Sequence, residues 1–385
     1  MDKNLHFSQT EFAARRQAAC AKLTAAGLDG LLMFRQESMY YLTGYDTFGF
    51  SFFQCLVMTS DGRFVLLTRS ADQRQAAFTS IVDDIRVWVD GADADPATDL
   101  REILADLGLD GGRLGVEYDS YGLTAHNGRR LDAALDGFAT LEDASRLVPE
   151  LRVIKSAAEI AYVRRAAELC DAAWQAAIDR AGPGVDEGDI LADMHNAVYR
   201  GGGDGAGNEF IIGSGPGAMM CRYYTGRRLL QPTDQLTLEF AGSYRHYHAA
   251  MMQTIGIGKP PTRQHDLWKA GTEALLACEA ALQPGNTIGD VFEAHVRTLD
   301  GAGLAKYRLN ACGYSLGTTF APIWMDGFMA YRDNPVIIQP GMVYFLHMII
   351  FDDETGLAAT PGRTSLVTAG GAEVLSRAGL DFIVR

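Results

Sequence analysis

A short apolar segment of the chain contains three side chains that are suited to proton transfer. Residues 235–258, QLTLEFAGSYRHYHAAMMQTIGIG, include Glu239, His246 and His248 among mostly apolar neighbours. Burying a carboxylate in such surroundings is costly unless another group pairs with it. Histidine, with an unperturbed pKa near 6.5, suits acid–base chemistry at neutral pH. The segment is therefore either part of a reactive site or a solvated strand face that carries surface histidines.

The same segment has the pattern of a β-hairpin. LTLEFA and YHAAMMQTIGIG are rich in β-branched and aromatic residues, and GSYR interrupts them, which predicts two strands and a turn. His246 has the strand parity of His248 but lies at the turn, which favours a structural role for it. We expect the elements around this hairpin to determine what Glu239 and His248 contact.

Composition restricts the class of protein. The chain has 385 residues, of which 48% are hydrophobic and 21% charged, enough for two globular domains. A formal net charge of -14 argues against nucleic acid or an anionic membrane as partner. There is no membrane-spanning apolar run and no signal-peptide pattern. The six cysteines form no CxxC pair, which predicts a reduced, cytoplasmic protein with neither a disulfide framework nor a thiolate metal site.

The order of predicted elements indicates two domains of different class. Residues 1–153 alternate helical and strand-like segments, which favours an α/β layered domain. Residues 154–385 begin with a long helical run and continue with glycine-rich loops, hairpins and two further helices, which favours an α+β domain.

Several phrases of the sequence occur in an order that is typical of a known family. They are YLTG, IKSAAEIAYVRRAA, SGPGAMMCRYYTGRRLL, LQPGNTIGDV and QPGMVYFLHMII. Together the phrases resemble the creatinase/prolidase family across nearly the whole chain. The resemblance implies an α/β domain of the creatinase N-terminal type over residues 1–153 and an α+β "pita-bread" catalytic domain over residues 154–385.

The resemblance also locates a metal site, and the residues found there do not suit one. Metal-dependent members of the family hold two ions with two Asp, one His and two Glu. In this chain the five positions fall on Glu239, Ala250, Tyr314, His347 and, exactly or within one residue, Gly362. Divalent ions need several converging carboxylate or imidazole ligands, and only Glu239 and His347 qualify. We therefore expect no metal, and no other cofactor is indicated.

Three further phrases resemble the ectoine hydrolase branch of this family, which is metal-free. They are EFAGSYRHYH, GYSLGTTFAPIW and GNTIGD. This resemblance implies metal-independent hydrolysis of a C–N bond in a small amidine or guanidino carboxylic acid, with ectoine-type ring opening favoured. Two departures from the branch concern the substrate: Arg222 stands where a histidine is expected, and Gln253 where an arginine is expected.

Three alternative functions are open at this point. The first is a creatinase-type amidinohydrolase, and the second is a metal-dependent Xaa-Pro dipeptidase or aminopeptidase. The third is a pita-bread module that binds a peptide or protein without catalysis.

An amidinium substrate suggests roles for four residues. Its carbon is already electrophilic, so the site needs an anion to hold the cation and a base or nucleophile. Glu239 suits the anion or the nucleophile, His347 and His248 are candidate bases, and Tyr314 is a candidate hydrogen-bond donor. Each also has a structural interpretation: Glu239 as the partner of a buried arginine, and the histidines as members of the core.

Other residues are candidates for binding the substrate. Arg222 or Arg363 can hold a substrate carboxylate in the bidentate manner of a guanidinium group. Trp324 and Phe320 can form a pocket wall that stacks on a planar amidine.

An aromatic loop in the first domain suggests a further contribution. Tyr45 opens the segment YDTFGFSF, residues 45–52, which suits a lid over a pocket. The family resemblance implies a homodimer in which this part of one subunit covers the pocket of the other. An ordinary interface or core loop is the competing interpretation. The partners expected are thus a cationic or zwitterionic small molecule and a second copy of the chain.

Overall fold

The computed structural model describes residues 3–222 and 227–385. The chain divides into two compact units, Met1–Arg152 and Val153–Arg385. Residues 223–226, which belong to the SGPGAMMCRYYTGRRLL phrase, lie outside the described part. Within the described residues, no helix has the length and apolar character needed to cross a bilayer.

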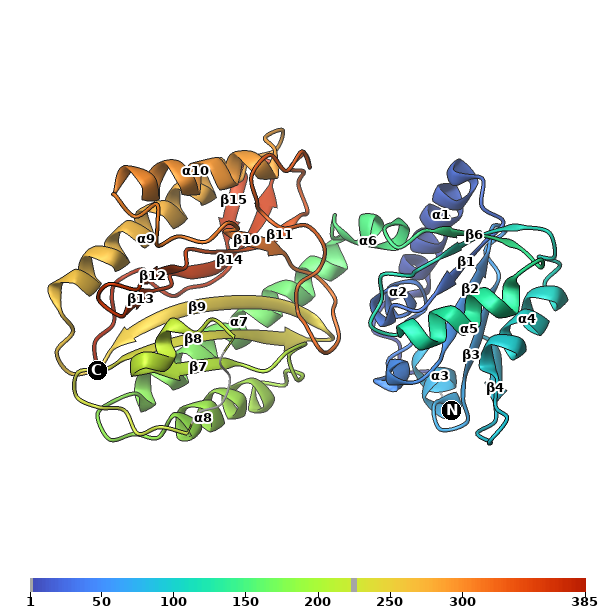
Figure 1. Cartoon of the computed structure of the whole chain (residues 1–385), viewed down its shortest axis with the longest axis horizontal. Coiled ribbons are helices and arrows are strands. Elements are labelled where there is room, and N and C mark those ends of the chain that lie inside the picture. The colour runs from blue at the N-terminus through green and yellow to red at the C-terminus, as the bar shows by residue number, and fades with distance from the viewer. Residues whose placement is uncertain (1–2, 223–226) are drawn as a thin grey trace. The chain divides into compact units, whose positions relative to one another are not determined.

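The first unit is an α/β layer structure, as the alternating pattern predicts (Figure 1). Its six-stranded mixed sheet has the order β4-β3-β2-β1-β5-β6. The strands are β1 Gly30–Met33, β2 Cys55–Thr59, β3 Phe64–Arg69, β4 Asp84–Trp88, β5 Arg113–Val116 and β6 Thr140–Asp143. The helices are α1 Gln9–Ala26, α2 Gln36–Thr43, α3 Gln73–Thr79, α4 Pro96–Asp106, α5 Ala125–Leu135 and α6 Leu147–Arg152, with a 3₁₀ turn η1 at Gly49–Ser51.

The second unit is built on a largely antiparallel sheet with the order β10-β11-β14-β9-β8-β7, and β15 pairs with β14. The strands are β7 Ile211–Ser214, β8 Gln235–Tyr244, β9 Tyr247–Gly256, β10 Gly313–Ser315, β11 Val343–His347, β14 Gly362–Thr368 and β15 Gly371–Val374. A separate two-stranded sheet consists of β12 Ile350–Asp352 and β13 Leu357–Ala359. The helices are α7 Ala157–Arg180, α8 Glu187–Arg200, α9 Thr262–Ala281 and α10 Ile288–Gly301, and η2 is a 3₁₀ turn at Gly215–Met219.

Helix α7 determines which face of β8 is covered. A capping box formed by Ser156 and Glu159 starts the helix. A Cβ on Gly242 would lie 2.0 Å from the carbonyl oxygen of Ala166, so only glycine permits this approach. Phe240 stacks on Trp174 of α7 on the same face. Because side chains alternate along a strand, the helix leaves Glu239 on the opposite face.

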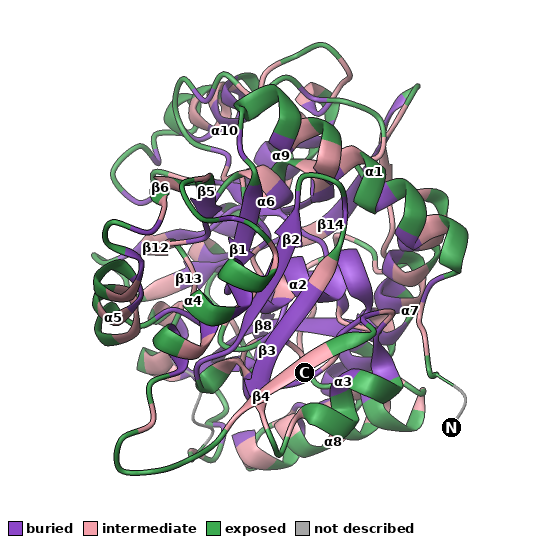
Figure 2. Ribbon diagram, turned by 90° about the vertical axis from the view of Figure 1, so that its right-hand side faces the viewer, coloured by how far each residue is buried: buried purple, intermediate pink, exposed green. Residues whose placement is uncertain are grey.

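The central hairpin differs from the sequence prediction at its turn. Strand β8 continues to Tyr244 and β9 starts at Tyr247, so the turn is Arg245–His246 and does not begin at Gly242. Both turn residues have positive φ, 50° and 65°, a geometry that usually selects Asn-Gly. The backbone N–H of Arg245 donates to the carboxylate of Asp204, which stabilises this turn. Figure 2 shows that β8 is buried almost throughout.

Candidate active site

Strand register places Glu239 and His347 in one transverse row of the sheet. Glu239 pairs with Met252, Met252 with Gly362, and Gly362 with His347. Paired residues of neighbouring strands project from the same face. Both side chains therefore point away from α7 and toward the same concave surface.

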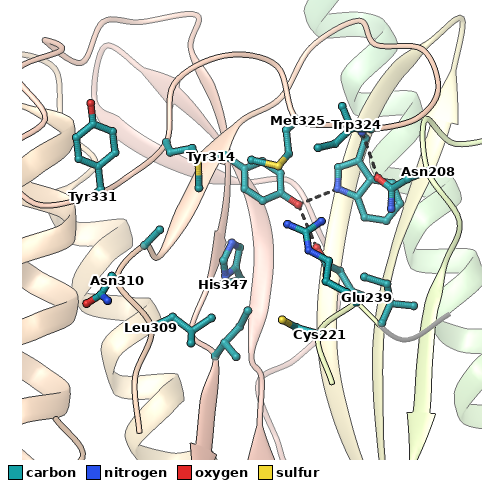
Figure 3. A pocket seen from close by; sticks show the side chains of 16 residues that line it. Asn208, Cys221, Glu239, Leu309, Asn310, Tyr314, Trp324, Met325, Tyr331 and His347 are labelled. Atoms are coloured by element: carbon teal, nitrogen blue, oxygen red, sulfur yellow. Dashed lines mark hydrogen bonds between the residues drawn. The ribbon is translucent and has the colours of Figure 1, made fainter. Parts of the chain in front are cut away.

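A hydrogen-bonded triad extends from this row. Tyr314 of β10 donates its hydroxyl to Oε1 of Glu239 at 3.0 Å. The indole Nε1–H of Trp324 donates to the same hydroxyl oxygen at 2.8 Å. An indole is only a donor and an ionised carboxylate is only an acceptor, so the tyrosine proton lies toward Glu239 when that carboxyl is ionised. Figure 3 shows Tyr314 between Glu239 and Trp324.

Burial makes Glu239 a proton acceptor suited to neutral pH. Desolvation raises the pKa of this carboxyl from 4.5 to about 7, and the Tyr314 hydrogen bond and the Arg222 charge oppose the shift. Among the described residues, the hydrogen-bond partner of Glu239 is the Tyr314 hydroxyl, which lies on Oε1. A base is most effective when its pKa is near the working pH.

His347 lies in the same cavity as an uncharged imidazole. Burial lowers its pKa to about 3, so the ring is uncharged at neutral pH. Within the described part of the chain, Nδ1 of His347 is buried without a hydrogen-bond partner. Its ring packs against Tyr314, with centroids 5.4 Å apart. Because the His347 side chain lines the cavity, this neutral imidazole is suited to bind a polar substrate group.

The triad and His347 line a cavity of about 440 Å³. That volume falls within the range typical of small-molecule sites. The walls are mainly apolar, and the polar groups Arg222, Asn208 and Tyr331 are placed among them. Arg222 also borders a second hollow of about 550 Å³, which shares Asn208 with the first.

Sequence reasoning did not identify Asn208, Asn310, Met325 or Tyr331 as lining residues. The amide oxygen of Asn208 accepts the backbone N–H of Trp324 at 3.2 Å, which fixes the start of the aromatic wall. All four lie outside the helices and strands. For Asn310 and Met325 the signal in the sequence was the irregular, aromatic-rich character of residues 308–327, whereas Asn208 and Tyr331 lie outside that segment.

His248 does not lie in the cavity. It projects from the same face as Glu239 but pairs with Ser243 at the turn end of the hairpin. Its Nε2 accepts the backbone N–H of Gly207 at 2.9 Å, so Nδ1 carries the proton and donates to the Thr319 hydroxyl at 3.1 Å. Burial, followed by the charge of His246, lowers its pKa to about 3. Fully buried and bonded at both nitrogens, His248 is in the wrong place to be the expected base.

Arg363 is also placed differently from the expectation. It follows Gly362 in β14, and one step along a strand reverses the face. Its guanidinium forms a bidentate pair with Glu279 of α9, with N–O distances of 2.7 and 2.8 Å. The prediction that it holds a substrate carboxylate is therefore wrong, and Arg222 is the arginine that lines the cavity.

Two aromatic residues proposed for substrate binding occupy other sites. Phe320 stacks on His246 with centroids 4.1 Å apart and does not line the cavity, whereas Trp324 does. Tyr45 is fully buried in the first unit, where its hydroxyl bonds Gln54 and Thr68. A side chain without exposed surface cannot contact a substrate, so Tyr45 is removed from the candidates.

The observed residues do not fit a two-metal centre. Ala250 and Gly362, at two of the family's ligand positions, have no donor side chain. Both backbone groups of Ala250 are bonded to the hydroxyl of Thr364, at 2.9 and 2.8 Å. Tyr314, at a third position, donates a hydrogen bond to Glu239 and accepts one from the indole N–H of Trp324. Too few donors remain for divalent ions.

Comparison with known proteins defines the class. Residues 161–372 match metallopeptidase family M24, and residues 15–154 match the creatinase/prolidase N-terminal domain. The chain belongs to family M24, with that N-terminal domain preceding the catalytic one. The creatinase-type α/β domain and the pita-bread domain expected from sequence are thus confirmed, and the chain is a hydrolase by family.

The relatives differ in the activity that their names state. The chain is 28% identical to the uncharacterized hydrolase/peptidase y4tM of Sinorhizobium fredii, with 99% of each chain covered. It is 27% identical to ectoine hydrolase of Halomonas elongata, with 97% of each covered. Among solved structures, the prolidase of Thermococcus sibiricus has a TM-score of 0.88 at 18% identity, covering 98% of this chain and 100% of that one. The last likeness concerns the fold alone.

The raised pKa of Glu239 predicts a pH-dependent effect on stability. The folded state binds this proton up to about pH 7 and the unfolded state only to about pH 4.5, so the stability it contributes is lost as pH rises through that interval. The loss amounts to about 3 kcal/mol. Glu239→Gln should therefore melt at about the wild-type temperature at pH 4.5 and several degrees higher at pH 8, measured by calorimetry. The exposed Glu209→Gln is the control, and a constant difference across pH would contradict the assignment.

Proposed function

We propose that this chain is a metal-independent hydrolase of a C–N bond in a small amidine or guanidino carboxylic acid, with ectoine-like ring opening favoured. The observation that carries the proposal is the transverse row of the sheet. In that row Glu239 and His347 face a cavity, and Gly362, at one of the fold family's metal positions, has no donor side chain. Ala250, at another of these positions, lies two residues from the row along β9 and has none either. The likeness to a named ectoine hydrolase over nearly the whole chain supports the same substrate class.

The charges that line the cavity are complementary to a zwitterion. Glu239, once ionised, offers a negative charge to an amidinium, and the exposed Arg222 offers a positive charge to a carboxylate. Apolar walls keep the local dielectric low, which strengthens both attractions. A ligand that carries an amidinium and a carboxylate on a compact apolar body is therefore complementary to Glu239, to Arg222 and to the apolar walls.

Hydrolysis requires that water be deprotonated and added to the amidinium carbon. Glu239, with a pKa of about 7, is suited to take the water proton, because it is half ionised at neutral pH and one oxygen is already held by Tyr314. The neutral ring of His347 is suited to bind the substrate nitrogen across the cavity. The C–N bond then breaks in the tetrahedral adduct, and the proton held by Glu239 passes to the departing amine.

We also propose that the chain is a cytoplasmic homodimer. The six cysteines are all unpaired, in keeping with a reducing compartment. Phe48 and Phe52 of the 45–52 loop are 80% and 48% exposed, which suits a subunit contact more than contact with water.

For the homodimer, light scattering during size-exclusion chromatography should give twice the chain mass. Phe48→Ser should shift the equilibrium toward monomer, because it removes apolar surface from the contact. The exposed Val89→Ser serves as the matched control. A chain that stays monomeric at all concentrations measured would contradict the proposed homodimer.

A turnover panel tests the substrate class. Mass spectrometry should detect hydrolysis of ectoine, hydroxyectoine or creatine at equal rates with and without EDTA, and no cleavage of Xaa-Pro dipeptides. Glu239→Gln should reduce kcat at least a hundredfold, because it removes the base, whereas Glu209→Gln in the neighbouring hollow should retain activity. Dipeptide turnover that EDTA abolishes would establish the metal-dependent peptidase instead. No turnover, with unchanged ligand binding in Glu239→Gln, would favour the binding module.

The hydrogen-bonded triad predicts a characteristic change in the pH profile. The rate constant kcat/KM should rise with pH through about 7 as Glu239 ionises. Tyr314→Phe removes a bond that stabilises the carboxylate, so the rise should move to higher pH, and Trp324→Phe should give a smaller shift in the same direction. Tyr331→Phe, in the same cavity, should leave the midpoint unchanged. An unmoved midpoint in Tyr314→Phe would exclude Glu239 as the titrating base.

A further inference from the structure

A second cluster of chemically reactive side chains lies outside the cavity. Cys278 of α9, His295 of α10 and Cys312, which precedes β10, each place one donor atom within 4.8 Å of the others. Met348, directly after β11, completes the cluster. All four residues are fully buried, and none lines the cavity described above.

The distances within this cluster resemble those of a single coordination sphere. The Nδ1 atom of His295 lies 3.1 Å from Sδ of Met348, and Sγ of Cys278 lies 3.9 Å from the same sulfur. Ligands at about 2.0 Å (nitrogen) and 2.3 Å (sulfur) from a tetrahedral ion are separated by roughly 3.5 Å. Small rotations of the side chains would therefore bring all four donors onto one ion.

The chemical nature of the donors indicates which ion would fit. Two thiols, an imidazole and a thioether are soft or borderline ligands, which select thiophilic d¹⁰ ions and disfavour magnesium, calcium and manganese. Four ligands without an open position are typical of a structural site, not a catalytic one. Two thiolates also neutralise a divalent charge, which lowers the cost of burying it.

The cluster shows one unmet bonding requirement. Nε2 of His295 is buried without a hydrogen-bond partner among the residues that the structure describes. A buried polar atom in this condition costs free energy. No hydrogen bond from Nε2 to a described residue therefore opposes a rotation of the ring toward the sulfurs.

We propose that Cys278, His295, Cys312 and Met348 bind one thiophilic d¹⁰ ion, Zn(II) or Cu(I), as a structural site. On binding, the two thiols release their protons to solvent and form metal–sulfur bonds, with no change of oxidation state. The ion connects α9 and α10 to the segments before β10 and after β11. Because the carbonyl of Cys312 accepts the backbone N–H of His347 at 3.0 Å, it stabilises the strand that carries His347.

The site is independent of the proposed hydrolysis, since no step of that reaction uses the ion. It also modifies the expectation that six scattered cysteines form no thiolate site. Cys278 and Cys312 are far apart in sequence, and the hydrophobic core of the second unit brings them together.

Anaerobic titration of the reduced full-length protein tests the proposal. Zn(II) is added in competition with a chromophoric chelator, and Cu(I) in competition with bathocuproine disulfonate, and bound ions are counted by native mass spectrometry. One ion per chain is expected in wild type, in Glu239→Gln and in Cys170→Ala, whose buried thiol lies outside the cluster. Cys278→Ala and Cys312→Ala should lose it, and the ion should raise the melting temperature only where it binds.

Thiol labelling of the wild type covers the case in which a cysteine variant fails to fold. Partial denaturation in urea, alkylation and peptide mass spectrometry should show Cys278 and Cys312 labelled at least tenfold more slowly with the ion, and Cys55 of the first unit unchanged. Absence of protection, wild-type binding of the ion by Cys278→Ala and Cys312→Ala, or a mass lower by two hydrogens from a Cys278–Cys312 disulfide would each overturn the proposal. Loss of turnover in Glu239→Gln with one ion still bound would separate this site from the hydrolytic one.

Discussion

The curvature of the second sheet is the constraint on which the site depends. Tyr314 belongs to β10 and Glu239 to β8, four steps apart in strand order. On a flat sheet these strands would be separated by about 19 Å, since neighbouring strands are about 4.8 Å apart. A tyrosine and a glutamate cannot span that gap, yet their oxygens are 3.0 Å apart. The sheet must therefore curl until its edge strand faces its centre, and the concave face becomes a cavity.

That curvature also explains the electrostatic behaviour of Glu239. A carboxyl on a flat, open sheet would be hydrated and would keep an ordinary pKa. Here Tyr314 and Trp324 cover it, and loss of water raises its pKa more than the single tyrosine hydrogen bond lowers it. The tyrosine proton lies toward the ionised carboxylate, because Trp324 can only donate and the carboxylate can only accept. The packing of Tyr314 and Trp324 over Glu239 thus sets both the pKa of this carboxyl and the hydrogen bond that it accepts.

The sequence was sufficient for the domain classes, the central hairpin and the position of Glu239, because hydrophobic periodicity and ordered family phrases encode them directly. It also placed Tyr314, His347 and Trp324 beside the same cavity. Arg363 was misplaced because a shift of one residue changes the face of β14, and strand parity in a short irregular region is hard to fix from sequence. For His248, strand parity correctly predicted the face that it shares with Glu239. The parity did not show that His248 lies at the turn end of β9, away from the cavity. Loop residues such as Asn208 carried no periodic signal at all.

The region around β11 contains two groups of polar side chains: one lines the cavity, and the other is buried in the core. On the concave face, Ala250 and Gly362 stand at two positions where relatives hold ligands with hard donor atoms. The polar side chains that line the cavity there include Glu239 and the neutral His347. In the core, next in sequence to His347, Met348 joins two thiols and an imidazole that suit a soft ion. An ion with four protein ligands leaves no position for substrate. Its effect on the reaction would be confined to holding β11, and hence His347, in place beneath the cavity.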